Sequence, residues 1–445
     1  MRKNYFENVV FEEKDLARVV GNNTTPLEQE DDLNPLMNYI GDARYVMLGA
    51  ASHGTHEYNT WRMKITKRLI KEKGFSFVAI EGDWPDCYKV NRYVKGYSDG
   101  GENPVEILTN FNRWPTWMWA NWEMVAFIDW MKYYNEHLPL NKKIGFYGLD
   151  VYSLWESLEA IVEYLKVEDR KTMLTAIKAM NCFDKYGKDE GLSYARAASI
   201  VPEPCTKEVV ELLSEIRANM KHYNSDVEAP FNVEQNAIVA LNVEKYYRSL
   251  LKGGALSWNI REKHMMETLN RLMNFYGKYS KVVVWEHNTH IGDARAIEMP
   301  NKKMENLGQL TTQQHADEGV VLVGFGSYKG SVIASESWGG EMLKMHVPEA
   351  IETSWEHILH LAGGGKNKLL LFDKLRNVES FGYHISHRNI GVVYNSTDKQ
   401  QYNYEPSILP MRYDAFLYFE ETKSLQPIQV STDKKQTPET FPFGI

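Results

Sequence analysis

Histidine and acidic residues follow several short apolar runs of this sequence, where they are placed to do acid–base chemistry. His53 lies in a glycine-flanked turn after the run Tyr45–Gly49, and Glu81 ends the run Phe75–Glu81. A histidine whose charge is balanced by a carboxylate can take a proton from water, and the water can then attack an ester carbonyl. General-base hydrolysis is therefore the first chemistry that these residues indicate.

More residues of the same kinds follow later runs. Asp150 directly follows Ile144–Leu149, and both His287 and His290 follow Val282–Trp285. Runs of this length predict buried strands rather than core helices. The carboxyl ends of parallel strands share one edge of a sheet, and ligands bind at that edge in open α/β folds. We therefore expect five side chains to converge on one crevice: His53, Glu81, Asp150, His287 and His290.

A buried arginine is predicted in the helix that starts at about Thr55. Arg62 lies on the same helical face as three apolar residues, Tyr58, Ile65 and Leu69. A guanidinium keeps its proton, so in an apolar setting it needs a carboxylate, a phosphate or a polar ligand as its partner. We expect Arg62 and one of His287 or His290 to stabilise the negative charge that develops on an ester oxygen.

Three further residues are candidates for binding the substrate, namely Trp84, Asp150 and Asn288. Asp83 has a simpler explanation as the cap of a new helix, because Pro85 suits the first turn of that helix.

The acid–base residues require a sheet that brings strand ends together. Short apolar runs alternate with helical patterns here, which is typical of an α/β fold with a mostly parallel central sheet flanked by helices. A further strand is predicted at Val320–Phe325, and two later strands are predicted at Ile390–Tyr394 and Ala415–Phe419.

The domain organisation follows from the same patterns. The first 43 residues indicate an irregular or helical lead-in. Residues 152–278 form consecutive helical patterns without a convincing strand, which predicts a helical insertion or subdomain. We predict a single α/β domain over residues 1–445 that contains this insertion.

Composition and charge argue against several classes of function. The chain has 445 residues and a formal net charge of −8, with no basic patch for nucleic acid. No run approaches the roughly 18 apolar residues of a membrane span, and the first 20 residues lack the apolar core of a signal peptide. Cys87, Cys182 and Cys205 are odd in number and widely spaced, so we expect no disulfide framework and no structural zinc site. We predict a cytoplasmic protein that acts on a small-molecule ester without a cofactor.

Three alternatives stay open at this point. Ala50–Gly54 has the form A-x-S-x-G, one residue from a nucleophile elbow, so Ser52 could serve as a nucleophile with Asp150 and His287. Metal-assisted hydrolysis could instead use zinc or iron held by His287, His290, His53 and Glu81. The third alternative is a non-catalytic protein that binds a sugar or a macrocycle.

Several motifs of the chain resemble those of the erythromycin esterase-like family, some members of which carry succinoglycan biosynthesis labels. The resemblance spans about Gly41 to Phe419, and its motifs are specific in combination. They are Leu48–Glu57 with Arg62, Glu81–Asp86, Val90–Tyr93, Asn259–Glu262 with Met265, Trp285–His290, Gly391–Tyr394 and Tyr413–Phe416.

The resemblance implies a function as well as a fold. Esterase members of the family open a macrolide lactone by attack of water. By this resemblance, His53 is the general base and Glu81, Arg62, His287 and His290 form the rest of the site. The chain departs from the family at Ala50, where esterase members carry a glutamate. Either Glu81 or Asp150 replaces that carboxylate, or the activity is weakened, or the chemistry differs.

Overall fold

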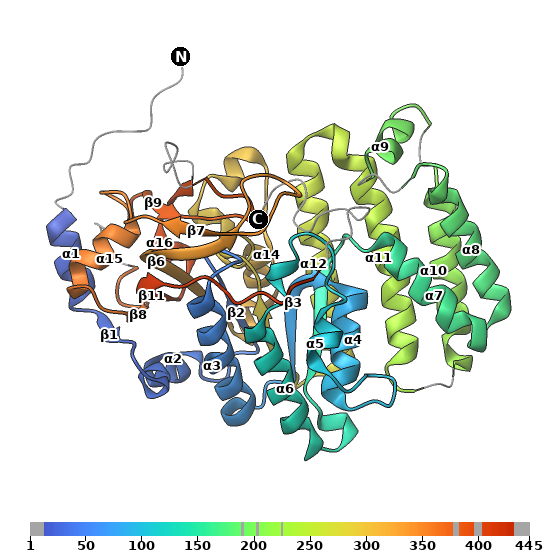
Figure 1. The fold of residues 1–445 in the computed structure, drawn as a ribbon, viewed down its shortest axis with the longest axis horizontal. Coiled ribbons are helices and arrows are strands. Elements are labelled where there is room, and N and C mark those ends of the chain that lie inside the picture. The colour runs from blue at the N-terminus through green and yellow to red at the C-terminus, as the bar shows by residue number, and fades with distance from the viewer. Residues whose placement is uncertain are drawn as a thin grey trace.

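A nine-stranded sheet forms the centre of the computed structural model, which describes residues 13–187, 191–201, 204–223, 226–376, 382–395 and 403–430 (Figure 1). The strand order is β1-β8-β11-β6-β2-β5-β3-β4, and β7 pairs with β6. A separate sheet pairs β9 with β10. The strands are β1 Thr24–Pro26, β2 Tyr45–Leu48, β3 Phe77–Asp83, β4 Gly145–Asp150, β5 Val282–Trp285, β6 Val320–Ala334, β7 Leu343–Val347, β8 Lys368–Leu371, β9 Ile385–Arg388, β10 Tyr404–Ser407 and β11 Ala415–Thr422.

The middle of the sheet is parallel, and it positions the predicted site. The strands β11, β6, β2, β5, β3 and β4 run in the same direction, while β1, β7 and β8 are antiparallel to their neighbours. The strands β2 and β5 are buried along their whole length, as expected for strands covered on both faces. The prediction of a mostly parallel central sheet is therefore confirmed, and the carboxyl ends of β4, β3, β5 and β2 lie next to one another.

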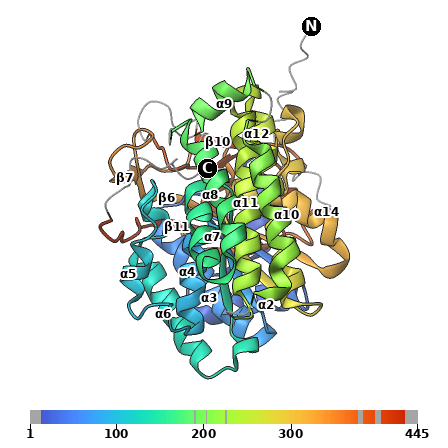
Figure 2. The ribbon, with the colours of Figure 1, turned by 90° about the vertical axis from the view of Figure 1, so that its right-hand side faces the viewer.

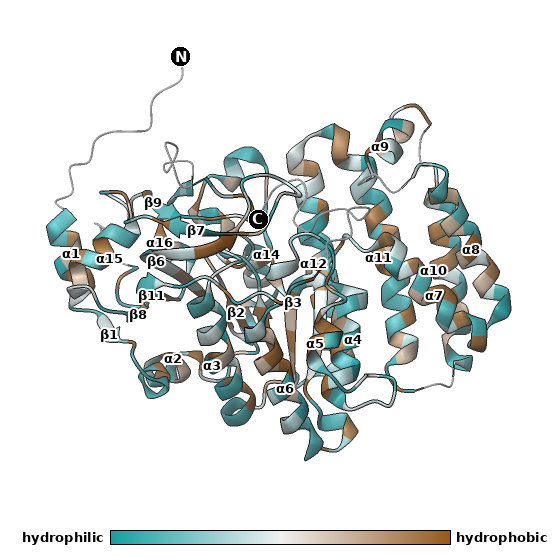
Figure 3. Cartoon of the chain, in the orientation of Figure 1, coloured by the Kyte–Doolittle hydropathy of each residue, from teal (hydrophilic) through white to brown (hydrophobic). Residues whose placement is uncertain are grey.

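Helices cover both faces of the sheet and enclose two large apolar cores. Helices such as α3 and α8 carry both hydrophilic and hydrophobic residues, as expected for elements with one buried face (Figure 3). None of the described helices combines the length and apolarity that crossing a bilayer requires. The helices outside the stretch between β4 and β5 are α1 Glu13–Gly21, α2 Asn34–Ile40, α3 His56–Lys73, α4 Trp84–Lys95, α5 Pro104–Leu108, α6 Trp122–Glu136, α13 Asn288–Ile291, α14 Leu307–His315, α15 Trp355–Gly363 and α16 Leu409–Arg412.

The regular elements that the structure describes between β4 and β5 are all helices. Figures 1 and 2 show α7, α8, α10 and α11 packed side by side at one end of the molecule. The helix α12 leads from this group back to the sheet, where it contacts β4. A helical segment thus interrupts the sheet as predicted, and its status as a subdomain over residues 152–278 stays a prediction. Its helices are α7 Leu154–Glu168, α8 Arg170–Asp184, α9 Leu192–Ala198, α10 Thr206–Asn219, α11 Ala229–Ser249 and α12 Gly254–Tyr276.

Some predictions about local structure are wrong. The stretch Ile390–Tyr394 is irregular, with a single bridge between Val393 and Ser335, and its apolar side chains pack in two small cores that include residues of β6. The lead-in contains the unpredicted strand β1, and its residues 1–12 lie outside the described residues. Asp83 precedes α4 as predicted, but its side chain pairs with Arg113 at 2.8 Å instead of capping the helix.

The prediction that the chain has no disulfide is also wrong. Cys182 near the end of α8 is bonded to Cys205 directly before α10, with 5.9 Å between their Cα atoms. The two helices pack against each other, and this packing brings together cysteines that are 23 residues apart in the chain. The inference of a reducing compartment loses its support, because it depended on the absence of disulfides.

Candidate active site

Two neighbouring strand ends form the centre of the candidate active site. The strands β2 and β5 are paired in parallel, so the residues that follow them leave the sheet side by side. The backbone N–H of Asn288 donates to the carbonyl oxygen of Ala50 at 2.8 Å, which continues this pairing past the strand ends. The turn after β2 that carries His53 and the turn after β5 that carries His287, the two corners of the site, are therefore held together.

His53 and His287 face each other across this junction. Their ring centroids are 5.0 Å apart, and the Nε2 atom of each ring is buried without a hydrogen-bond partner among the described residues. Burial lowers the pKa of His53 to about 4, although nearby Glu81 opposes the shift. Burial also holds the pKa of His287 well below its ordinary value. Both rings are therefore neutral at pH 7, and each keeps one nitrogen for a ligand.

The hydrogen bonds of His287 assign its proton to Nε2. Its Nδ1 atom accepts from the backbone N–H of Thr289 at 3.3 Å and lies 3.0 Å from the Thr289 hydroxyl. A neutral imidazole has one donor and one acceptor nitrogen, so an accepting Nδ1 makes Nε2 the donor. His287 thus presents an unpartnered N–H group, which is the kind of donor that stabilises an oxyanion.

A buried charge network supports the two imidazoles. Arg261 on α12 donates to both oxygens of Asp150, at 2.9 and 2.7 Å, and to Glu81 Oε1 at 2.8 Å. Glu81 Oε2 accepts from the backbone N–H of His287 at 2.9 Å. Burial acts to raise the pKa of Glu81, but the neighbouring imidazoles and Arg261 hold that pKa well below its ordinary value. Glu81 is therefore an ionised carboxylate that fixes the His287 backbone and attracts positive charge on His53.

His290 also belongs to this network. Its Nδ1 atom donates to Glu262 Oε1 at 2.6 Å, and its Nε2 atom lies 3.4 Å from Glu81 Oε1. Burial acts to lower the pKa of His290, but Glu262 and Glu81 outweigh it and raise that pKa well above its ordinary value. The other oxygen of Glu262 accepts from the backbone N–H of Leu307 at 2.7 Å. Nη1 of Arg261 also lies 3.2 Å from Nε2 of His290, so both ring nitrogens of His290 are held inside the network.

Arg62 is buried, as its helical spacing predicts. Its Nε atom donates to the carbonyl oxygen of Gly49 at 2.7 Å, and its Nη2 atom donates to the carbonyl oxygen of Glu286. These two carbonyls follow the ends of β2 and β5, so the guanidinium joins the two corners. A role of Arg62 in stabilising an oxyanion stays a prediction, and these bonds favour a positioning role.

The expected substrate-binding residues all bond to other protein groups. The indole N–H of Trp84 donates to Asn232 Oδ1 at 2.8 Å, and the amide of Asn288 donates to the carbonyl oxygen of Phe325 at 2.7 Å. Asp150 is held at both oxygens by the arginine of α12. The polar atoms of these side chains bond to other groups of the protein, and contact of these residues with substrate stays a prediction.

Neither alternative chemistry gains support from the geometry. The hydroxyl of Ser52 shares a hydrogen bond with that of Thr55, and in the described part of the chain no imidazole is bonded to it. No three His, Cys, Asp or Glu side chains among the described residues are arranged to hold a metal ion. Metal ligation through His290 would also compete with its bond to Glu262. Both alternatives remain hypotheses for experiment.

Three residues of the site received no role from the sequence, namely Arg261, Glu262 and Glu286. Arg261 and Glu262 come from the helical segment, and no strand pattern marks them. The available signal was a pair of ionisable residues within the apolar pattern of α12, three and two residues before the buried His264. Glu286 stands between the buried Trp285 and His287, where burial of its carboxyl could have been expected.

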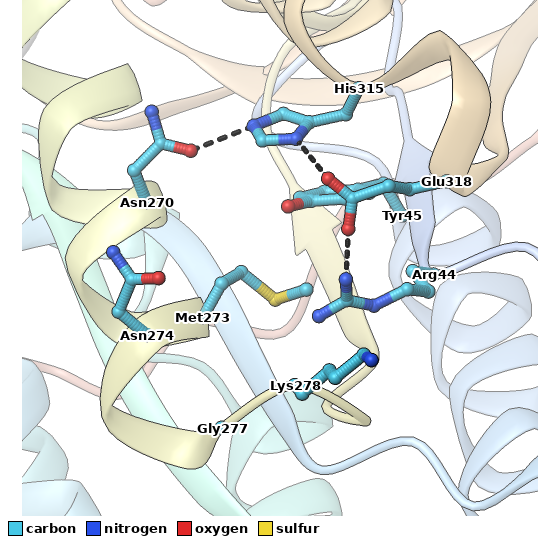
Figure 4. Close-up of a pocket in the computed structure, with 9 residues that line it drawn as sticks. All are labelled: Arg44, Tyr45, Asn270, Met273, Asn274, Gly277, Lys278, His315 and Glu318. Atoms are coloured by element: carbon cyan, nitrogen blue, oxygen red, sulfur yellow. Dashed lines mark hydrogen bonds and ion pairs between the residues drawn. The ribbon is translucent and has the colours of Figure 1, made fainter.

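A cavity of about 340 Å³ lies at the opposite edge of the sheet, beside the start of β2 (Figure 4). Its polar side chains satisfy one another. His315 lies 2.7 Å from Glu318 through Nδ1 and 2.8 Å from Asn270 through Nε2, and Arg44 is paired with the same glutamate. The unpartnered imidazole nitrogens lie at the carboxyl edge instead, and we therefore place the active site there.

Gly49 lies where the two corners approach each other closely, so a larger side chain at this position should disturb the site. A Cβ atom at this residue would lie 2.1 Å from Oδ1 of Asn288, so Gly49→Ala must displace the Asn288 amide. We expect the substitution to lower the free energy of unfolding by about 1–3 kcal/mol, the usual cost of overpacking. We also expect it to reduce catalysis, because His287 precedes the displaced residue. Chemical denaturation and turnover assays measure the two effects.

A double variant checks the cause of this loss. Asn288→Ala removes the amide that the new methyl group would meet most closely and leaves a contact with Ile291 Cδ1 at 3.1 Å, so Gly49→Ala should cost much less stability in that background. A full additional loss in the double variant would show that the clash with Asn288 is not the reason that glycine is needed.

Comparisons with known proteins agree with this architecture. A solved structure of a succinoglycan biosynthesis protein superposes with a TM-score of 0.75 at 21% identity, covering 93% of this chain and 98% of the other. A mutant of erythromycin esterase EreC in its open conformation superposes with a TM-score of 0.62 at 16% identity, covering 90% and 97% of the two chains. At these identities the likeness concerns the fold.

Sequence comparisons identify the family. Erythromycin esterase type II of Escherichia coli is 22% identical over 329 residues, which are 69% of this chain and 75% of that protein. Putative hydrolase YbfO of Bacillus subtilis is 22% identical over 279 residues, or 58% of this chain and 59% of that protein. The family model described as erythromycin esterase matches residues 70–422, which is most of the chain. The chain therefore belongs to the erythromycin esterase family.

Proposed function

We propose that the protein hydrolyses a carboxylic ester or a macrolactone with a water molecule that His53 activates. The observation that supports this proposal is the pair His53 and His287 after two parallel strands: their ring centroids lie 5.0 Å apart, and each Nε2 atom is buried without a hydrogen-bond partner among the described residues. Membership of the erythromycin esterase family supports an ester substrate, and the E. coli relative supports a macrolide as a candidate.

The proposed reaction uses the two imidazoles in different roles. His53 Nε2 takes a proton from water as the water oxygen bonds to the carbonyl carbon. The electron pair of the carbonyl bond moves to its oxygen, which accepts a hydrogen bond from His287 Nε2–H. The ionised Glu81 stabilises the imidazolium that forms at His53, because an opposite charge nearby favours the protonated ring.

The network behind the imidazoles keeps them in place and does not react. Arg261 pairs with Glu81 and Asp150, and His290 pairs with Glu262, so these side chains are held in fixed positions behind the imidazoles. Arg62 holds the carbonyls after β2 and β5 and thereby fixes the separation of the two corners. We assign these residues positioning roles.

The pH dependence of the reaction should reveal the low pKa of His53. A base must be unprotonated, and burial lowers the pKa of His53 from 6.5 to about 4. As the pH falls, kcat/KM should stay high through pH 6 and decline only as the pH approaches about 4. Return of the enzyme to pH 7 before a second assay separates reversible titration from unfolding. A decline centred near the ordinary histidine value would contradict the assigned environment.

A substrate screen tests the proposed function. The purified chain is assayed against a panel of alkyl esters, aryl esters, lactones and macrolides, with His53→Gln as the blank. We expect turnover of at least one compound class, with incorporation of ¹⁸O from labelled water into the acid product. If no compound in the panel is hydrolysed and a sugar or a macrocycle binds unchanged, the non-catalytic alternative replaces the proposal.

Two reagents separate the remaining mechanisms. A fluorophosphonate should not label the chain at Ser52, because the proposed attack forms no acyl-enzyme. Labelling that Ser52→Ala abolishes would favour the serine mechanism. Loss of activity with a chelator and recovery with zinc or iron would favour the metal mechanism.

A further inference from the structure

Glu286 has a buried carboxyl group that the charge network does not use. It directly follows β5 and is 1% exposed. Both of its carboxyl oxygens are buried without a hydrogen-bond partner among the described residues. The site carboxylates Glu81 and Glu262 differ in this respect, because each accepts hydrogen bonds at both oxygens.

The neutral form of this carboxyl is the stable one. An ionised carboxylate that is buried without a donor costs several kcal/mol, so such a group keeps its proton. Burial raises the pKa of Glu286 well above its ordinary value, and the negative charges of Glu81 and Glu262 add to the effect, although His290 opposes it. Glu286 is therefore a carboxylic acid at neutral pH, with one O–H donor.

The backbone places this acid at the reactive edge. The N–H of Glu286 donates to the carbonyl oxygen of Leu48 at 3.3 Å, which sets Glu286 beside Gly49 at the end of β2. Its own carbonyl oxygen is held by Arg62, and the next residue in the chain is His287. The acid thus stands at the junction that brings the two neutral imidazoles together.

We propose that Glu286 is a catalytic residue that donates a proton to the leaving alcohol, a role that rests on the proposed ester hydrolysis. A site with a neutral histidine and a neutral carboxylic acid holds a base and an acid at the same pH. The base takes the proton of the attacking water, and the acid supplies the proton that the departing oxygen needs.

The proton balance of this step closes. When the tetrahedral intermediate collapses, the bond between the carbonyl carbon and the alkoxy oxygen breaks. Its electron pair goes to the oxygen, which takes the proton of Glu286 and leaves as the alcohol. The imidazolium of His53 then returns its proton to the Glu286 carboxylate. One water and one ester give one acid and one alcohol, and both side chains regain their starting states.

The dependence on the leaving group tests this role. The wild-type chain and Glu286→Gln are compared on an alkyl ester and on a p-nitrophenyl ester of the same acid, chosen from the screen. An alkoxide is a poor leaving group and needs the proton, so we expect Glu286→Gln to lower kcat for the alkyl ester by about 10²-fold or more. A p-nitrophenolate leaves without a proton donor, so Glu286→Gln should lower kcat for the p-nitrophenyl ester much less.

Glu356→Gln serves as the matched control. Glu356 is also a fully buried glutamate with one unpartnered oxygen, but it bonds to His387 on β9. This variant should leave the ratio of the two rates unchanged. An infrared spectrum at pH 7 should also show a protonated carboxyl band that Glu286→Gln removes and Glu356→Gln retains.

The outcomes separate this assignment from the proposed function. Equal losses on both esters, or no loss on either, would overturn the assignment while the active wild type upholds hydrolysis. An unchanged infrared band in Glu286→Gln would also overturn it. A wild type that hydrolyses no ester would overturn the proposed function and the assignment together. Should Glu286→Gln fold poorly, Glu286→Asp keeps an acid and should retain the leaving-group dependence of the wild type.

Discussion

Replacement of His53 by Gln should lower kcat for ester hydrolysis by about 10²- to 10⁴-fold, the usual contribution of a general base. Glutamine keeps polar atoms at the corner but cannot take a proton from water. The fold should persist, because Nε2 of His53 makes no hydrogen bond to the described residues. Steady-state rates on the best substrate of the screen, with the melting temperature measured beside them, check this result.

Ser52→Ala is the matched control for this variant. Ser52 is adjacent in the chain, and its hydroxyl shares a hydrogen bond with that of Thr55. We expect its replacement to change kcat far less than His53→Gln does. Full activity of His53→Gln together with an inactive Ser52→Ala would reverse the assignment and indicate a serine nucleophile.

Replacement of Arg261 by Met should destabilise the protein by about 3–5 kcal/mol, the usual cost of removing one partner from a buried ion pair. The guanidinium is fully buried and bonds to both Asp150 and Glu81. Its loss removes from the core the cation that bonds to both of these carboxylates. Chemical denaturation measures the free energy of unfolding.

Arg271→Met on the same helix is the control. Arg271 is partly exposed and pairs with Glu234, so its loss should cost about 1 kcal/mol or less. Equal costs for the two variants would show that the buried network around Arg261 contributes no more to stability than a partly exposed pair.

The sequence predicted the sheet and the strand ends because their signals are local. Each central strand is a short apolar run, and the side chain that ends it must emerge at the edge of the sheet. Once β2, β5, β3 and β4 are known to be neighbours in a parallel sheet, the convergence of His53, Glu81, Asp150 and His287 follows from topology.

The partners within the site could not be predicted, because they depend on tertiary packing. Arg261 and Glu262 reach the site from α12, which belongs to the helical segment. Arg261 bonds to Asp150, and Glu262 bonds to His290, which was expected to be one of two candidates for stabilising an oxyanion. The bond between Cys182 and Cys205 likewise depends on how α8 and α10 pack.

The protonation states of the site residues could not be predicted from the sequence either. Histidine type and spacing do not show that burial holds the pKa of His53 and His287 low while neighbouring carboxylates hold that of His290 high. The carboxyl of Glu286 gives no sequence signal for its proton either. These assignments follow from the hydrogen bonds and charges that surround each group.

The most direct test of the site is a double-variant cycle on His53 and His287. Rates are measured for His53→Gln, His287→Gln and the double variant on one ester, with folding checked for each chain. If both imidazoles act on the same acyl group, the double variant should lose little more activity than the worse single variant, because groups that act as a unit are not additive. A shared site at the ends of β2 and β5 would be contradicted if the fold-decreases in rate of the two single variants multiplied in the double variant. Full activity of His287→Gln would contradict it as well.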